Sequence, residues 1–160
     1  MKTKDIVEAL CKKHDTRNPF EIARQKKIMV IHEPLGSING YYNRCYRQSF
    51  IHINSDLERE QQLFTCAHEL GHAVLHPKAN APFLRANTFF SINKLEIEAN
   101  KFAVNLLVQD EAIIELLEFS VPEIACILGL GEDLVLYKYQ LLKDSKLLTA
   151  RFTNCFLGKG

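Results

Sequence analysis

The sequence has no run of apolar residues long enough to cross a membrane. No stretch approaches the ~20 consecutive apolar residues that a spanning helix needs. Its first residues also lack the continuous apolar segment of a secretory signal, because charged side chains recur throughout residues 1–23. We therefore expect a soluble cytoplasmic protein that does not act at a membrane.

The sequence also lacks paired cysteines and an excess of charge. The five cysteines are scattered and never form a C-x-x-C pair, which disfavours a disulfide framework and predicts reduced thiols. The 20 basic and 19 acidic residues leave a formal net charge of +1. Overall charge therefore gives no reason to expect direct nucleic-acid binding, and only a local patch could serve it.

The length and the hydrophobic pattern predict a single α+β domain with a helical extension. A chain of 160 residues, 47% of them hydrophobic, can bury a substantial core. Helical spacing near the start is followed by a second short helix with Asn18 as its cap and Pro19 at its first position. Three short β-branched or aromatic runs then predict a small sheet, which we expect to be antiparallel. These runs are residues 28–34, 41–47 and 49–54.

The longest predicted helix follows the sheet. It opens with Ser55 or Asp56 as cap and Glu58 shortly after, and it stops at Pro77. Residues 77–94 have no clear period and are predicted to form a surface loop, after which residues 94–108 resume helical spacing. The remainder predicts two or three short helices. We expect residues 1–110 to form the main domain and residues 111–160 a helical extension packed on it.

The predicted long helix carries the segment "TCAHELGHAVLHP", which contains an H-E-x-x-H motif. His68 and His72 lie four residues apart and so share one face of a helix, where both imidazoles can bind one Zn²⁺. Glu69 would then act as general base on a water at the metal. Composition alone gives about 0.02 chance occurrences of this motif in a chain of this length.

A glycine lies inside the same helix. Gly71 costs about 1 kcal/mol relative to alanine in mid-helix, so something is expected to approach its backbone closely. A strand passing nearby would explain it.

His76 continues the four-residue spacing but cannot complete the site. Positions eight apart on a regular helix are separated by ~12 Å along the axis, whereas ligands of one zinc ion lie ~3.3 Å apart. We expect His76 to cap the end of the helix, where a cation also suits the helix dipole.

The third ligand must come from elsewhere, and Glu96 and Glu98 are the candidates. Glu96 shares a helix face with small residues and with Asn100, which could hydrogen-bond a ligating imidazole. Glu98 lies on a different face. We favour Glu96 as the third metal ligand and keep Glu98 as the alternative.

The segments "HELGHAVLH" and "EIEANKFAVNLL" together resemble the ImmA/IrrE family of zincin-like metallo-endopeptidases. The resemblance implies a zincin-like fold, zinc held by His68, His72 and Glu96, and Glu69 as the catalytic base. It also implies cleavage of a partner helix-turn-helix transcriptional repressor, in a phage, mobile element or stress regulon. The family pattern does not identify the oxyanion donor, for which Tyr41, Tyr42, Tyr46 and His76 are candidates.

Two other functions are compatible with the sequence. An antirepressor or scaffold could bind its partner without proteolysis, with zinc mainly structural; such a site normally has a fourth protein ligand, and Cys66 points to another face than His68. The C-terminal helices could alternatively bind DNA as a helix-turn-helix pair. Their second helix, "EDLVLYKYQLL", offers one lysine only, which favours packing inside the protein.

Overall fold

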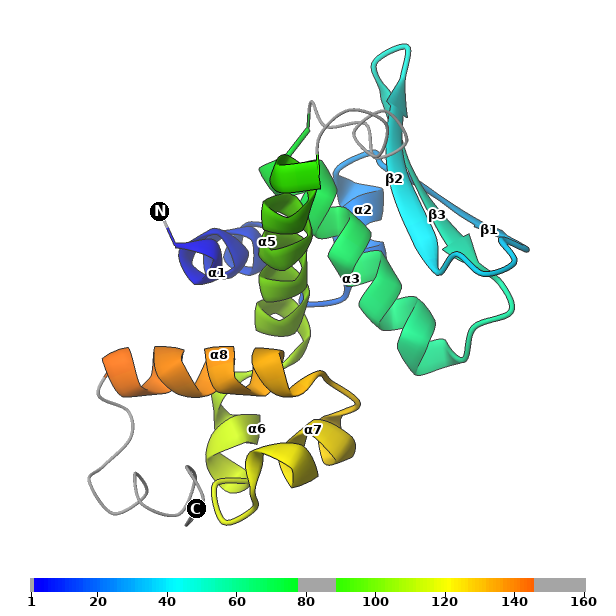
Figure 1. The fold of residues 1–160 in the computed structure, drawn as a ribbon. Coiled ribbons are helices and arrows are strands. Elements are labelled where there is room, and N and C mark those ends of the chain that lie inside the picture. Colours follow the sequence, from blue (N-terminus) through cyan, green and yellow to red (C-terminus); the bar gives the residue numbers. More distant parts are fainter. Residues whose placement is uncertain (1, 78–88, 146–160) are drawn as a thin grey trace. The chain divides into compact units, whose positions relative to one another are not determined.

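A computed structural model describes residues 2–77 and 89–145, which divide into two compact units between Leu107 and Val108 (Figure 1). Each unit is described by itself. The α+β class is confirmed: the first unit combines a three-stranded sheet with helices, and the described part of the second unit is helical. No helix among the described residues is both long and apolar enough to cross a bilayer.

Two short helices open the first unit, α1 (Thr3–His14) and α2 (Pro19–Gln25). The predicted cap of α2 is confirmed, because the Asn18 side chain accepts hydrogen bonds from the backbone N–H groups of Phe20 (2.9 Å) and Glu21 (3.3 Å). α2 buries Ile22 and Ala23 in the core of the unit.

The sheet contains β1 (Met29–Glu33), β2 (Gly40–Cys45) and β3 (Gln48–Asn54) in the order β1-β3-β2. β2 and β3 are antiparallel, but β1 runs parallel to β3, so the expectation of an antiparallel sheet was wrong for that pair. The cause is the position of β3 at the centre, where Ile51 and Ile53 are fully buried. The sequence does not reveal this order, because the alternation of apolar and polar residues within a strand is the same whether its neighbour is parallel or antiparallel.

The long helix α3 (Arg59–Leu75) begins later than predicted. Its cap is Glu58, not Ser55 or Asp56, and Glu58 and Gln61 form a capping box. The reason is that the Asn54 side chain accepts the Asp56 N–H at 3.0 Å, which holds these residues in a turn. The helix ends at Leu75, with His76 as its C-cap before Pro77.

The helix α5 (Phe89–Leu107) begins earlier than predicted, so residues 89–94, expected in a loop, are helical. Asparagine at position 93 has a weak helix propensity, but the propensity of single residues predicts poorly where a helix begins, and the helix that includes residues 94–107 extends back to Phe89. The rest of the predicted loop, residues 78–88, lies outside the described residues.

The core of the first unit lies where α3 packs against the sheet, α2 and α5. α3 contributes Cys66, Ala67 and Leu70, while α5 contributes Phe102 and other fully buried side chains. Each large apolar side chain buried in this way contributes roughly 1.5–3 kcal/mol. The two helices that carry the H-E-x-x-H motif and Glu96 are thus fixed against each other by the core.

The second unit contains α6 (Asp110–Glu115), α7 (Val121–Leu128) and α8 (Glu132–Asp144). The predicted breaks are confirmed, with Ser120 capping α7 and Gly129 ending it at a φ of 63°. Lys138, the one lysine of the "EDLVLYKYQLL" segment, is only 1% exposed, and its Nζ lies 2.6 Å from the Asp110 carboxylate. Packing of this unit on the first one stays a prediction.

Candidate functional site

The two histidines of the H-E-x-x-H motif face each other on α3. Their Nε2 atoms lie 3.1 Å apart, and their ring centroids are 4.8 Å apart. This is the consequence of the four-residue spacing, which places both imidazoles one above the other on one face of the helix. His72 is buried and His68 half-buried.

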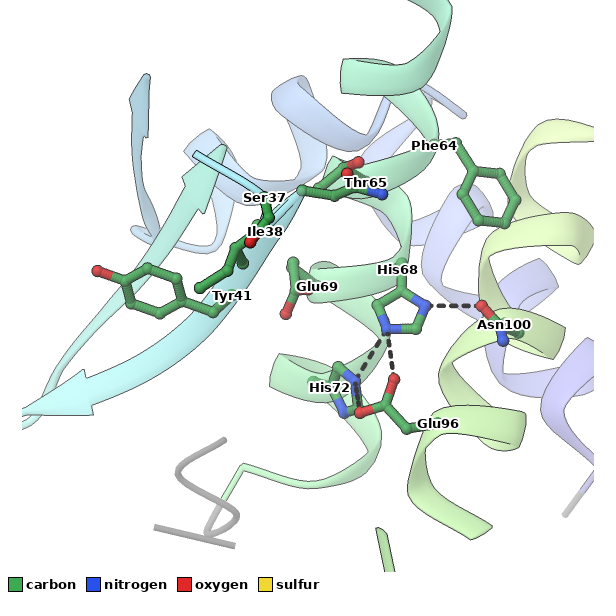
Figure 2. Close-up of a pocket in the computed structure, with 12 residues that line it drawn as sticks. Ser37, Ile38, Tyr41, Phe64, Thr65, His68, Glu69, His72, Glu96 and Asn100 are labelled. Atoms are coloured by element: carbon green, nitrogen blue, oxygen red, sulfur yellow. Dashed lines mark hydrogen bonds and ion pairs between the residues drawn. The ribbon is translucent and has the colours of Figure 1, made fainter. Parts of the chain in front are cut away.

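Glu96 approaches the two imidazoles from α5 (Figure 2). One carboxylate oxygen lies 3.2 Å from Nε2 of His68 and the other lies 3.4 Å from Nε2 of His72. A ligand atom from each of these residues fits within 4.8 Å of the others, a set that could hold a metal ion. Zinc ligands lie ~3.3 Å apart, so the donor types and their spacing fit this ion.

Glu98, the alternative candidate, has a different partner. Its carboxylate lies 3.1 Å from Nε2 of His76 and does not join His68 and His72. His76 is the C-cap of α3, as predicted, but burial lowers its pKa below the usual value and outweighs the opposing effect of Glu98. The lowered pKa gives less support to a cationic imidazole at the helix end, and that contribution stays a prediction.

Asn100, one turn after Glu96, orients His68. Its Oδ1 lies 2.8 Å from Nδ1 of His68, as expected for a residue supporting a metal-ligating imidazole. When Nδ1 donates its proton to this oxygen, Nε2 carries a lone pair directed at His72 and Glu96. The hydrogen bond thus selects the tautomer that can bind a cation at Nε2.

Glu69 lies beside the imidazoles and is only 6% exposed. Burial raises the pKa of its carboxyl group, although the positive charge of His68 and His72 opposes the rise and the backbone N–H of Tyr42 hydrogen-bonds the carboxylate. A raised pKa suits a general base, because a carboxylate of ordinary acidity binds a proton too weakly at neutral pH.

The charges around the histidines favour a cation. Hydrogen bonds with His68 and His72 lower the pKa of Glu96 and keep it ionised. Burial tends to lower the pKa of His68, but hydrogen bonding to Glu96 and the charge of Glu69 outweigh it and raise the pKa. Two carboxylates beside two imidazoles stabilise positive charge, which protons or a divalent ion can supply.

These side chains line a cavity of about 450 Å³. α3 supplies Thr65, His68 and Glu69 to it, and residues 37–41 form the opposite wall (Figure 2). Gly40 allows this close approach of β2 to α3, because a Cβ there would lie 2.5 Å from Cγ2 of Thr65 and 2.6 Å from the His52 carbonyl.

The arrangement of two histidines, one glutamate and a buried second glutamate can be compared with known proteins. Residues 23–126, which include all four side chains, match the Peptidase_M78 family model, the IrrE N-terminal-like domain. The chain belongs to this metallopeptidase family. It is 43% identical over 134 residues to "Uncharacterized immunity region protein 2" of Bacillus phage phi105, which covers 82% of this chain and 85% of the relative.

A second relative in this family bears a name that describes an activity. The chain is 36% identical over 125 residues to "Metallopeptidase ImmA" of Bacillus subtilis (strain 168), which covers 72% of this chain and 69% of the relative. The resemblance to the ImmA/IrrE family stated from the two motifs is therefore confirmed.

Gly71 permits close packing in this family member, but against a helix and not the expected strand. A Cβ at Gly71 would lie 3.1 Å from Cβ of Phe102 and 3.2 Å from Cα of Ala99, both on α5. The spacing "E-x-x-A" in α5 could have indicated this, since Ala99 lies one turn after Glu96 and offers a similarly small surface.

Asn54 was not identified as a site residue from the sequence, yet it holds the wall of the cavity. Its Nδ2 donates to the carbonyls of Gly36 and Ile38, both at 3.0 Å, and its Oδ1 accepts the N–H of Leu35 at 3.3 Å. Its position at the end of a strand was visible, but nothing in the local pattern indicated that its amide would bind a distant loop.

None of the tyrosines proposed as oxyanion donors presents its hydroxyl to the imidazoles. Tyr41 lines the cavity, but its ring stacks on His52 at 4.3 Å and its hydroxyl points away from His68 and His72 (Figure 2). Tyr42 is buried with its hydroxyl 3.2 Å from Oγ of Ser49, and Tyr46 is exposed in the β2–β3 turn.

Proposed function

We propose that this protein is a zinc-dependent endopeptidase of narrow specificity that cleaves a partner helix-turn-helix transcriptional repressor in the cytoplasm. The observation that carries the proposal is the convergence of His68, His72 and Glu96 within 4.8 Å, next to the buried carboxyl group of Glu69. Membership of a metallopeptidase family supports the protease activity.

In the proposed mechanism His68, His72 and Glu96 would hold the metal ion. When bound, the ion would supply Lewis acidity towards water and the peptide carbonyl. Glu69 would take a proton from the attacking water as the new C–O bond forms and deliver it to the leaving amine nitrogen as the C–N bond breaks. Asn100 keeps His68 in the tautomer that binds the ion.

The proposed substrate rests on the family resemblance and on the name of one relative. The phage phi105 relative is called an immunity region protein, and the family resemblance implies a helix-turn-helix repressor as the substrate. The cavity of about 450 Å³ can accept a few side chains of an extended chain but not a folded domain. We therefore expect cleavage within an exposed loop or linker of the repressor.

A non-catalytic antirepressor with structural zinc is the alternative, and the site geometry gives it less support. A structural zinc site normally has four protein ligands, whereas the described residues bring only three together. Cys66, the nearest thiol in sequence, is fully buried in the core, and burial raises its pKa to about 12. It is therefore a poor metal ligand.

The test is the Glu69→Gln substitution in zinc-loaded protein, assayed against a panel of helix-turn-helix repressors. We expect the wild-type protein to cleave a member of this panel, and the variant to retain zinc while cleavage falls by at least roughly a hundredfold. Cleavage at the wild-type rate by a variant that binds zinc would show that Glu69 is not the base. Binding without cleavage by the wild-type protein would favour the antirepressor.

A further inference from the structure

A second cavity, of about 440 Å³, lies in the first unit between α2 and β1. Phe20 of α2 and Met29 and Val30 of β1 contribute apolar surface to it, and Arg24, Lys27 and Gln48 contribute polar groups. Met29 is 53% exposed, so its side chain is accessible to a partner. None of the described residues lining this cavity carries a carboxylate.

This cavity and the candidate active site lie at opposite ends of β3. Met29 pairs with Phe50 and Cys45 with Gln48 near the start of β3, whereas Gly40 beside the active site pairs with Ile53 near its end. Five residues of a strand span roughly 17 Å, so the two cavities are separate sites towards opposite ends of the sheet. A single extended polypeptide could nevertheless reach both.

The rim of the second cavity is basic. Arg24, Lys26 and Lys27 are exposed, and within the described chain no ion pair joins them to a carboxylate. Arg17 and Lys138, by contrast, have their charges offset by Glu8 and Asp110. The unpaired charges therefore create a local positive potential that a net charge of +1 conceals.

The backbone next to this rim is strained. Lys27 has a φ of 57°, and Tyr46 and Arg47, in the turn that leads to Gln48, have φ values of 47° and 69°. Gln48 connects the two segments, since its Nε2 donates to the Lys27 carbonyl at 2.8 Å. Glycine or asparagine would be more stable in a two-residue hairpin turn of this kind.

Packing of the Tyr46 side chain does not offset this strain, because the residue is 99% exposed. The β2–β3 turn projects from the end of the sheet (Figure 1), so the aromatic ring is fully presented to solvent. Tyrosine and arginine are the residue types that most often dominate binding energy at protein interfaces. The turn thus presents two such side chains at a place where the backbone is strained.

We propose that this surface, formed by Arg24, Lys27, Met29, Gln48 and the Tyr46–Arg47 turn, docks an acidic segment of a protein partner. An apolar side chain of the segment enters the cavity, while flanking carboxylates face Arg24 and Lys27. The apolar floor favours a polypeptide over nucleic acid, since phosphates and sugars would leave Phe20 and Met29 without apolar contacts. The docking function goes beyond the proposed proteolysis and does not depend on it.

The experiment measures binding of fluorescein-labelled peptides to the full chain by fluorescence anisotropy, at low and physiological salt. The probes are a panel of extended glutamate-rich peptides with one central Leu, Ile, Met or Phe. One control panel has the apolar residue replaced by serine, and another has the glutamates replaced by lysine. A labelled DNA duplex is the probe for nucleic acid.

The variant that tests the surface is Arg24→Glu with Lys27→Glu. Its matched control is Lys12→Glu with Lys13→Glu, which makes the same charge change at exposed positions of α1. We expect the acidic apolar panel to bind wild type, and its best member to bind the Arg24/Lys27 variant at least about tenfold more weakly but the control variant nearly as well. Tyr46→Gly should weaken binding while raising the thermal midpoint, because glycine relieves the turn.

Three results would overturn the proposal. The first is no binding by any member of the acidic apolar panel, or binding equal to that of the serine or lysine controls. The second is an equal loss in the two charge-reversal variants, which would indicate non-specific attraction. The third is tighter binding of the DNA duplex than of every peptide, which would identify a different occupant.

Discussion

At the scale of single residues, the candidate site depends on how each donor atom is held. His68 is aimed by the 2.8 Å hydrogen bond to Asn100, and Glu69 is held by burial and by the backbone of Tyr42. Glu96 and Glu98 also have different neighbours. Glu96 pairs with His68 and His72, whereas Glu98 pairs with His76. The chemistry of these residues therefore rests on neighbours that do not themselves touch the proposed ion.

Replacing Asn100 with alanine should weaken zinc binding by roughly ten- to a hundredfold, because His68 loses the acceptor that fixes its tautomer and orientation. The measurement is a competition titration with a chromophoric chelator. Asn100→Asp, which keeps an acceptor oxygen, should restore most of the affinity. Unchanged affinity in Asn100→Ala would show that the hydrogen bond does not position His68.

At the scale of elements, the site is assembled from α3, α5 and the loop between β1 and β2. Asn54 at the end of β3 holds that loop through several hydrogen bonds, and Gly40 and Gly71 remove side-chain bulk where β2 and α5 approach α3. These contacts decide the width of the cavity. Substitutions in them should therefore change both stability and the site.

Asn54→Ala should lower the free energy of unfolding by about 2–4 kcal/mol, because several part-buried backbone groups lose their partner at once. Chemical denaturation measures this loss. Asn43→Ala is the comparison, since Asn43 lies on the neighbouring strand and its buried Oδ1 has no hydrogen-bond partner among the described residues. Equal losses in the two variants would contradict the role assigned to Asn54.

Gly71→Ala should lower the thermal midpoint and weaken zinc binding together. The gain in helix propensity is about 1 kcal/mol, but the new Cβ presses on Ala99 and Phe102, and overpacking costs about 1–3 kcal/mol. Because Glu96 lies on the helix that is displaced, the ligands also move apart. Calorimetry measures the thermal midpoint, and the chelator titration measures zinc affinity. A raised midpoint with unchanged zinc affinity would show that α5 shifts to accommodate the new Cβ at little cost in free energy.

The elements illustrate what the sequence could and could not predict. Local signals such as Asn18 before Pro19, Gly129, and the H-E-x-x-H spacing predicted their structures correctly, because each acts within one or two turns of chain. The parallel pairing of β1 with β3 and the delayed start of α3 were missed. Both depend on contacts between distant segments, and strand alternation or a capping pattern does not contain that information.

At the scale of the whole molecule, the described residues form two units with separate cores. The first carries the site and the second is a set of helices around Ile113, Leu117 and Ile124. The one lysine in the "EDLVLYKYQLL" segment is buried in the second unit's interior and paired with Asp110. The packing of this helix on the first unit and the absence of DNA contact stay predictions, and the pairing of Lys138 with Asp110 was not foreseeable from spacing.

Lys138→Met should destabilise the second unit by about 3 kcal/mol, because the Asp110 carboxylate loses the cation that lies 2.6 Å from it. Denaturant unfolding followed by circular dichroism measures this change.

Wild-type protein should show no salt-dependent binding of a DNA duplex through this unit, and the Lys138→Met variant should also show none. A loss of DNA binding in Lys138→Met would mean that the lysine contacts phosphate instead.

The most direct measurement of the central claim is metal analysis of wild type beside Glu96→Ala and Glu98→Ala. We expect about one zinc ion per chain in the wild-type protein and in Glu98→Ala, because the Glu98 carboxylate pairs with His76, and we expect loss of zinc in Glu96→Ala. Loss of zinc in Glu98→Ala with retention in Glu96→Ala, or a wild-type protein that binds no metal, would contradict it.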